Sequence, residues 1–193
     1  MQAATLATWR ERLSGRPNKE LTLQLAHEAM TNIGTLELLY ALLYGDSESL
    51  RWRAAWVLEK VSQKQPSLLY AERARLTALA MRTDISDGVR RLLLSICFHM
   101  PDDKECDVQF YNFLLDTMVN LQSSAGVQAL AIKLAARMSC VDNILHDEFQ
   151  CIIRNMEMEY YSPGVRAAIR NCMKMKKVKK SRTSLGLNHY NSL

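Results

Sequence analysis

A short serine-led motif recurs at a nearly constant interval, and this period constrains the fold more than any other feature. The four copies open at Ser47, Ser86, Ser124 and Ser162, which are 39, 38 and 38 residues apart. A period near 40 residues with helix signals inside it is typical of stacked helical-repeat arrays. The spacing therefore predicts an all-α chain built from similar units.

Each serine is placed to begin a helix. It stands three residues before a Leu or Val, and a serine hydroxyl at a helix N-cap accepts a hydrogen bond from a free N–H of the first turn. The next residue is Glu48, Asp87 or Pro163 in three copies. A carboxylate is favourable at the positive end of a helix, and proline has no N–H to leave unpaired there. The motif therefore predicts four serine-capped helices.

An apolar pattern with helical spacing follows each serine. With the Leu or Val as position 0, the residues at positions 0, 4, 7, 8 and 11 are apolar in nineteen of twenty cases. At about 100° per residue these positions share one helix face, which we expect to be buried. The exception is Lys176 in the last copy, where a terminal repeat is expected to turn polar.

A helical stretch precedes each serine-capped helix, so the chain is predicted to form helix pairs. We expect four pairs, over residues 34–65, 67–100, 107–139 and 143–178. Two earlier helices, 3–13 and 18–31, lack the motif and are interpreted as an N-terminal capping pair. The predicted domain is 1–178, followed by a basic, disordered C-terminal tail, 179–193.

Composition favours a single helical domain in a reducing compartment. The chain has 193 residues, only seven Gly and four Pro, and no apolar run near 18 residues, so we expect no transmembrane helix and no secretory leader. The five cysteines form no CxxC pair, and Cys97 and Cys172 fall on the apolar face. Buried thiols and a cytoplasmic location are the resulting expectation.

The net charge of +5 comes from the C-terminal end of the chain. Residues 174–193 contain six basic residues and no acidic ones, which leaves 19 basic and 20 acidic residues before them. This tail could contact an anionic ligand such as nucleic acid or a lipid surface, or only solubilise the chain. Its candidate residues are Lys174, Lys176, Lys177, Lys179, Lys180 and Arg182.

The stretch from Leu36 to Leu58 resembles a HEAT repeat. Leucines fill its first half, Asp46 stands in the turn, and Leu50-Arg51 leads a small-residue run in the second half. Later copies keep Val-Arg at residues 89–90 and 165–166, whereas Gln128 replaces the arginine. The resemblance covers about 34–178 and implies a right-handed α-α superhelix of the HEAT/ARM type, with four helix pairs and a capping pair. It also implies that the arginine is structural, tying repeats or turn carboxylates together.

The run from Ala55 to Glu59 is also similar to short bacterial HEAT-like proteins that are sometimes labelled adenylosuccinate lyase. That enzyme family is longer and has a mobile loop of Ser-Ser-x-Met-Pro type. In this chain Ser123-Ser124 is followed by Ala-Gly-Val. The label therefore gives no reason to expect lyase activity.

The second helices of such a superhelix line its concave side, so their exposed stripe is the candidate binding surface. The stripe is predicted at positions 2, 6 and 9, where aromatic and arginine side chains could anchor a partner. Trp52 and Trp56 could instead pack on the capping helices. The candidate residues are Trp52, Trp56, Glu59, Arg91, Ser95, Phe98, Lys133 and Asn171.

Three functions remain open on the sequence alone. The leading hypothesis is a non-enzymatic scaffold that binds a protein or peptide in the concave groove. The alternative is a nucleic-acid-binding protein resembling the HEAT-like DNA alkylation-repair glycosylases, although the near-neutral body speaks against it. Enzymatic activity comes last, because no acid/base pair, nucleophile elbow, phosphate loop or zinc spacing is recognisable. No metal or other cofactor is expected.

Overall fold

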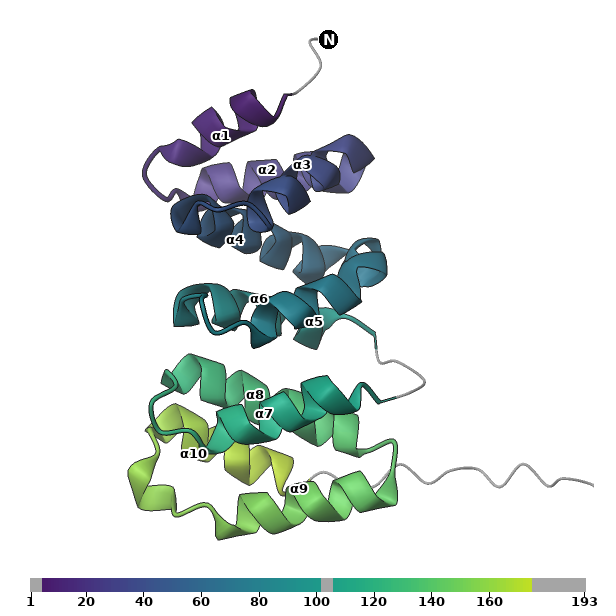
Figure 1. The fold of residues 1–193 in the computed structure, drawn as a ribbon, viewed down its shortest axis with the longest axis vertical. Helices are drawn as coiled ribbons and strands as arrows, with labels where there is room; N and C mark the ends of the chain where they lie inside the picture. The colour runs from purple at the N-terminus through teal and green to yellow at the C-terminus, as the bar shows by residue number, and fades with distance from the viewer. Residues whose placement is uncertain (1–4, 102–105, 175–193) are drawn as a thin grey trace, which may run out of the picture.

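The computed structural model describes residues 5–101 and 106–174 and shows helices stacked along one axis (Figure 1). This part of the chain contains ten α-helices, two short 3-10 helices and no strand, so the prediction of an all-α solenoid is confirmed. The elements are α1 Leu6–Ser14, α2 Lys19–Thr31, α3 Ile33–Leu43, α4 Glu48–Lys64, η1 Pro66–Glu72, α5 Arg73–Met81, α6 Asp87–His99, α7 Val108–Val119, α8 Ala125–Ser139, α9 Asn143–Asn155, η2 Met158–Tyr160 and α10 Pro163–Cys172.

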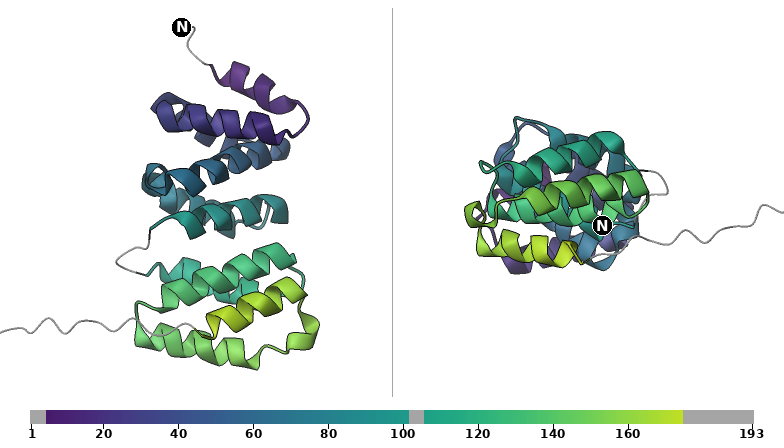
Figure 2. Two further views of the ribbon diagram at one scale, coloured as in Figure 1. Left: turned by 180° about the vertical axis from the view of Figure 1, so that it is seen from behind. Right: turned by 90° about the horizontal axis from the view of Figure 1, so that it is seen from below.

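The second helices of the pairs pack on one another in series. Helix α2 contacts α4, α4 contacts α6, α6 contacts α8, and α8 contacts α10 (Figures 1 and 2). The first helices α3, α5 and α7 each pack beside the second helix that follows them in the chain. Each unit therefore buries its apolar surface mainly against its neighbours, as in other repeat arrays.

Three of the four predicted serine caps are present. The hydroxyls of Ser47, Ser86 and Ser162 each accept a hydrogen bond from the backbone N–H three residues later. The prediction is wrong for Ser124, whose side chain makes no such bond, although α8 still begins directly after it. The packing of α8 between α6 and α10 supports this helix without the side-chain cap.

The apolar face predicted from the spacing forms the core. Nineteen of its twenty positions lie in the described residues, and seventeen of those side chains are buried. The exceptions are Leu50, which is half-buried, and Met173, which is 40% exposed at the end of the last helix. In the N-terminal pair, Trp9, Leu25 and Ala29 are buried as well, so this pair extends the core to that end of the stack.

Two of the predicted pairs have a short first α-helix. In the pair 67–100, the chain begins as the 3-10 turn η1 and becomes α-helical only at Arg73. In the pair 143–178, the first helix ends at Asn155, whose amide donates to the carbonyl of Cys151 and so satisfies one terminal acceptor. The predicted tail 179–193 lies outside the described residues.

Candidate interaction surface

The candidate surface is the exposed side of α4, α6, α8 and α10, which we call the second-helix face. Three of its predicted residues are exposed: Arg91, Lys133 and Asn171. Four are half-buried: Trp52, Trp56, Ser95 and Phe98. Glu59 is buried.

The two tryptophans of α4 form one aromatic unit. The ring centroids of Trp52 and Trp56 lie 5.3 Å apart with the planes tilted by 45°. Trp52 also lies directly against α6, because a Cβ atom added at Gly88 would be only 3.2 Å from its ring. The glycine therefore permits the indole to bridge α4 and α6 while part of the ring remains in contact with solvent.

Arg91 repeats this arrangement one repeat later. A Cβ atom added at Gly126 would lie 2.8 Å from the Cδ atom of Arg91, so the arginine stem crosses from α6 to the first turn of α8. Trp52 and Arg91 occupy the same position of successive repeats, and each faces a glycine of the next one. Position 2 is therefore a packing position between repeats and an exposed position at once.

Glu59 does not belong to the exposed surface, which corrects the prediction. Its side chain is covered by α6 and is 7% exposed. The carboxylate accepts hydrogen bonds from Gln63 at 2.6 Å and from Ser95 at 3.2 Å, and it pairs with Lys60 at 2.8 Å. A buried carboxylate requires such partners. Counting positions along α4 could not show that α6 covers Glu59.

Two cations surround the ring of Phe98 at the next junction. The Lys133 Nζ lies 6.0 Å and the Arg137 Cζ 5.3 Å from the ring centroid, both within cation–π range. Arg137 also donates to the carbonyls of Phe98, at 2.5 Å, and Cys97, at 3.0 Å, so it caps the C-terminus of α6. The sequence prediction missed Arg137, although it follows Lys133 by one helical turn on the same face.

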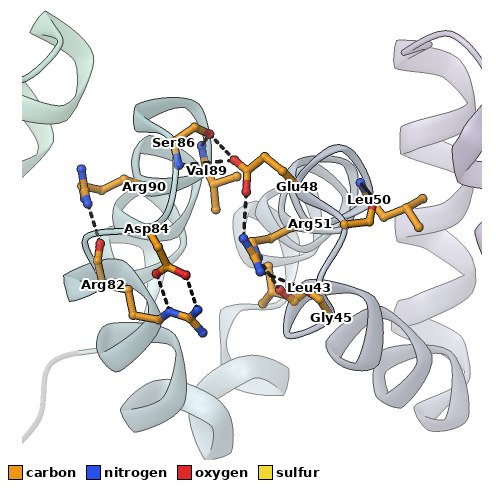
Figure 3. Close-up of polar contacts among 11 residues, drawn as sticks. Leu43, Gly45, Glu48, Leu50, Arg51, Arg82, Asp84, Ser86, Val89 and Arg90 are labelled. Atoms are coloured by element: carbon orange, nitrogen blue, oxygen red, sulfur yellow. Dashed lines mark hydrogen bonds and ion pairs between the residues drawn. The ribbon is translucent and has the colours of Figure 1, made fainter.

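Carboxylates link the N-termini of consecutive second helices. Glu48 accepts hydrogen bonds from both the backbone N–H and the hydroxyl of Ser86, one repeat further on (Figure 3). Asp87 accepts a hydrogen bond from the backbone N–H of Ser124 at 2.7 Å in the same way. The equivalent residue of the third repeat is Ala125, which has no carboxylate to offer Ser162. This series of contacts, which we call the carboxylate ladder, therefore spans only the first three repeats.

Two of the three arginines that follow the Leu or Val, Arg51 and Arg90, have the structural role predicted for them. Arg51 donates to the carbonyls of Leu43 and Gly45 at the end of α3 and pairs with Glu48 at 2.8 Å (Figure 3). Arg90 makes the corresponding contacts at the end of α5. Gln128 keeps one such bond, to the carbonyl of Asn120. These side chains therefore join the two helices of a pair and are not available to a ligand.

The remaining predicted residues are not brought together with these groups. Asn171 lies on α10 and makes no described side-chain hydrogen bond to the other predicted residues. Lys174 is exposed after that helix, and the other five tail residues lie outside the described residues. Within the part of the chain that the structure describes, no helix is long and apolar enough to span a membrane, and no three metal-ligating side chains cluster.

Several tyrosine and cysteine side chains have pKa values that are raised mainly by burial. Burial and the carboxylate of Glu72 raise the pKa values of Tyr40 and Tyr44, which stack beside Arg75 between α3 and η1. Burial also raises the pKa of the Cys172 thiol, which keeps it protonated. These shifts favour structural roles for the two half-buried tyrosines and for this thiol.

Comparison with known families identifies one match. A family model described as a HEAT repeat domain matches residues 9–176, from α1 to just beyond α10. Comparison with curated proteins and with solved structures found no match. The similarity to proteins labelled adenylosuccinate lyase therefore remains an untested resemblance.

Proposed function

The chain belongs to the HEAT-repeat family, and from this premise we propose that it is a non-enzymatic scaffold that binds a protein or peptide on its second-helix face. The observation behind the proposal is the half-buried tryptophan pair, Trp52 and Trp56, at the junction of α4 and α6. Tryptophans that are held rigidly but remain accessible are the side chains that most often dominate binding energy in protein interfaces.

The surroundings of the tryptophan pair suit an elongated ligand. From Trp52 the exposed side chains continue through Arg91 on α6 to Lys133 on α8, with Phe98 between the last two helices. Because packed helices lie about 8–10 Å apart, this path has the length of a short extended segment. An extended peptide laid across the helices would contact all three.

The tryptophan pair gives a direct test of this site. Peptides selected for binding to the full chain by display from a random library should lose affinity by about 30-fold for Trp52→Ala/Trp56→Ala, since each anchor is a hot-spot residue. Tyr160→Ala is the matched control, because Tyr160 is an exposed aromatic residue in η2 that lines a hollow together with residues of the first helix α9. Equal affinity of wild type and the tryptophan variant for every selected peptide would refute the site.

Nucleic-acid binding is the second candidate, and it is favoured by the basic side chains Arg91, Lys133 and Arg137 on the second-helix face. It predicts binding of oligonucleotides that weakens steeply with salt, because released counterions supply much of the affinity. Binding that disappears when only residues 175–193 are removed would place this property in the tail and not on the face.

An enzymatic role is not part of the proposal. A purified chain that converts adenylosuccinate at a rate above that of a boiled control would overturn the scaffold assignment and support the lyase label.

A further inference from the structure

Charge is distributed unequally between the two helices of each pair. Helices α4, α6, α8 and α10 together contain ten Lys and Arg residues and three Asp and Glu residues. Their partners α3, η1 with α5, α7 and α9 contain three basic and five acidic residues. The near-zero net charge of the body therefore conceals a basic layer of second helices beside a mildly acidic layer of first helices.

The three carboxylates of the basic layer already have partners within the protein. Glu48 is bonded to Arg51 and Ser86, and Asp87 to Arg90 and Ser124. Glu59 is buried among Lys60, Gln63 and Ser95. These contacts neutralise the carboxylates, so none of them offers a free negative charge on the exposed side of the layer.

Two central cations of this layer, Arg91 and Lys133, are exposed. No carboxylate within the described residues forms an ion pair with either of them. A stretch of uncompensated positive charge thus extends over the junction of α6 and α8.

The aromatic and basic parts of the face are connected. Trp52 packs on Gly88, and Arg91 lies one turn further along the same helix. Arg91 in turn packs on Gly126 of α8, the helix that contains Lys133. The tryptophan pair is therefore separated from the furthest of these cations by about two helix spacings, roughly 20 Å.

This arrangement, which rests on the proposed scaffold function, identifies the chemistry of the partner. We infer that the second-helix face binds an extended acidic peptide segment of a partner protein, with an apolar or aromatic residue at Trp52 and Trp56 and carboxylates at Arg91 and Lys133. At about 3.3 Å per residue, the apolar residue and the last of the acidic residues are separated by roughly six positions. Opposite charge across such an interface selects the partner and orients it.

A peptide fits the face better than a nucleic acid because few aromatic ring faces are open for stacking. Nucleotide bases bind single-strand proteins by stacking on accessible aromatic faces. In this structure two cations lie over the ring of Phe98, while Trp52 and Trp56 lie against each other. Few uncompensated cations line the path, whereas proteins that bind DNA strongly neutralise about 6–10 phosphates.

The test uses peptide display on the full chain, followed by titration of synthetic peptides monitored by fluorescence anisotropy. Selected peptides should be enriched in Asp and Glu near an apolar residue. The best peptide should bind Arg91→Glu/Lys133→Glu at least about tenfold more weakly than wild type, and Arg91→Gln/Lys133→Gln should show a smaller loss. Replacing the peptide's Asp and Glu by Asn and Gln should weaken binding to wild type.

The control variant is Arg10→Glu/Arg154→Glu, which changes the net charge equally on the exposed sides of α1 and α9. It should retain wild-type affinity within about twofold, because salt screens the long-range effect of the changed net charge. Any such long-range effect is the same in both variants, so a larger loss for Arg91→Glu/Lys133→Glu reports local contacts. Equal weakening by both pairs would overturn the inference, as would selected peptides that are neutral or basic; the scaffold function would then stand. If no peptide binds but oligothymidylate does, the scaffold function fails as well and nucleic acid is the ligand.

Discussion

The junctions between consecutive second helices differ at the two ends of the stack. The α4–α6 and α6–α8 junctions are each crossed by a carboxylate bonded to the next serine residue and by a large side chain packed on the next glycine. The α8–α10 junction has neither. Alanines replace the crossing side chains at residues 125, 129 and 136, and a Cβ atom added at Gly164 would meet only the hydroxyl of Ser162, at 4.0 Å.

This difference distinguishes the contacts that stabilise every repeat from the side chains that form the exposed surface. All three junctions share the buried apolar face, and α8 packs on α10 without the additional contacts. The crossing residues Trp52, Arg91 and Phe98 are also those that define the candidate surface. The first three repeats of the serine motif therefore provide the proposed binding face, and the last one mainly completes the core.

The largest effect is expected from the carboxylate ladder. Glu48→Ala removes the bonds to Ser86 and leaves the buried guanidinium of Arg51 without its anion, which should lower the free energy of unfolding by about 1–2 kcal/mol. Ala125→Asp should raise it by about 0.5–1 kcal/mol, because it supplies the missing acceptor for Ser162. Urea denaturation followed by circular dichroism measures both changes.

A charge at a helix N-terminus is favourable by itself, so Ala125→Asp needs a control. Combining it with Ser162→Ala in a double-mutant cycle isolates the part of the contact that the serine hydroxyl makes, because the backbone N–H of residue 162 remains. A coupling energy near zero would show that this hydroxyl does not bond to a carboxylate at residue 125 as the hydroxyl of Ser86 bonds to Glu48.

A smaller effect should distinguish the glycines of the two ends. Gly164→Ala adds a methyl group in open space and should stabilise α10 by roughly 0.5 kcal/mol through lower chain entropy. Gly88→Ala places the same methyl group 3.2 Å from the ring of Trp52, so a net loss of about 0.5–1 kcal/mol is expected. Thermal unfolding of the two variants provides the comparison, and stabilisation by both would show that Trp52 is not packed tightly.

The period, the caps and the apolar spacing were sufficient to predict the fold. These signals lie within one repeat, and each repeat buries the same positions of its apolar face. The surface was predicted only in part, because exposure depends on the neighbouring helix. Glu59 on α4 is covered by α6, and Arg137 on α8 contacts the ring of Phe98 on α6. Neither contact can be predicted from the sequence of one helix alone.

The distribution of charge on the surface, too, could be determined only from the structure. A count over the body gives almost equal numbers of acidic and basic residues, which by itself speaks against nucleic-acid binding. Only the assignment of each residue to a first or second helix reveals the basic layer. The partners of Glu48 and Asp87 lie about 38 residues away, so their neutralisation could not be predicted from local sequence.

Hydrogen–deuterium exchange of the full chain with and without the tightest selected peptide tests the central claim most directly. Binding on the second-helix face should slow exchange in α4, α6 and α8, and should leave α7 and α9 unchanged. Protection confined to α9 and α10, or to η1 and α5, would contradict the account, because the ligand would then occupy a surface that the crossing side chains do not form.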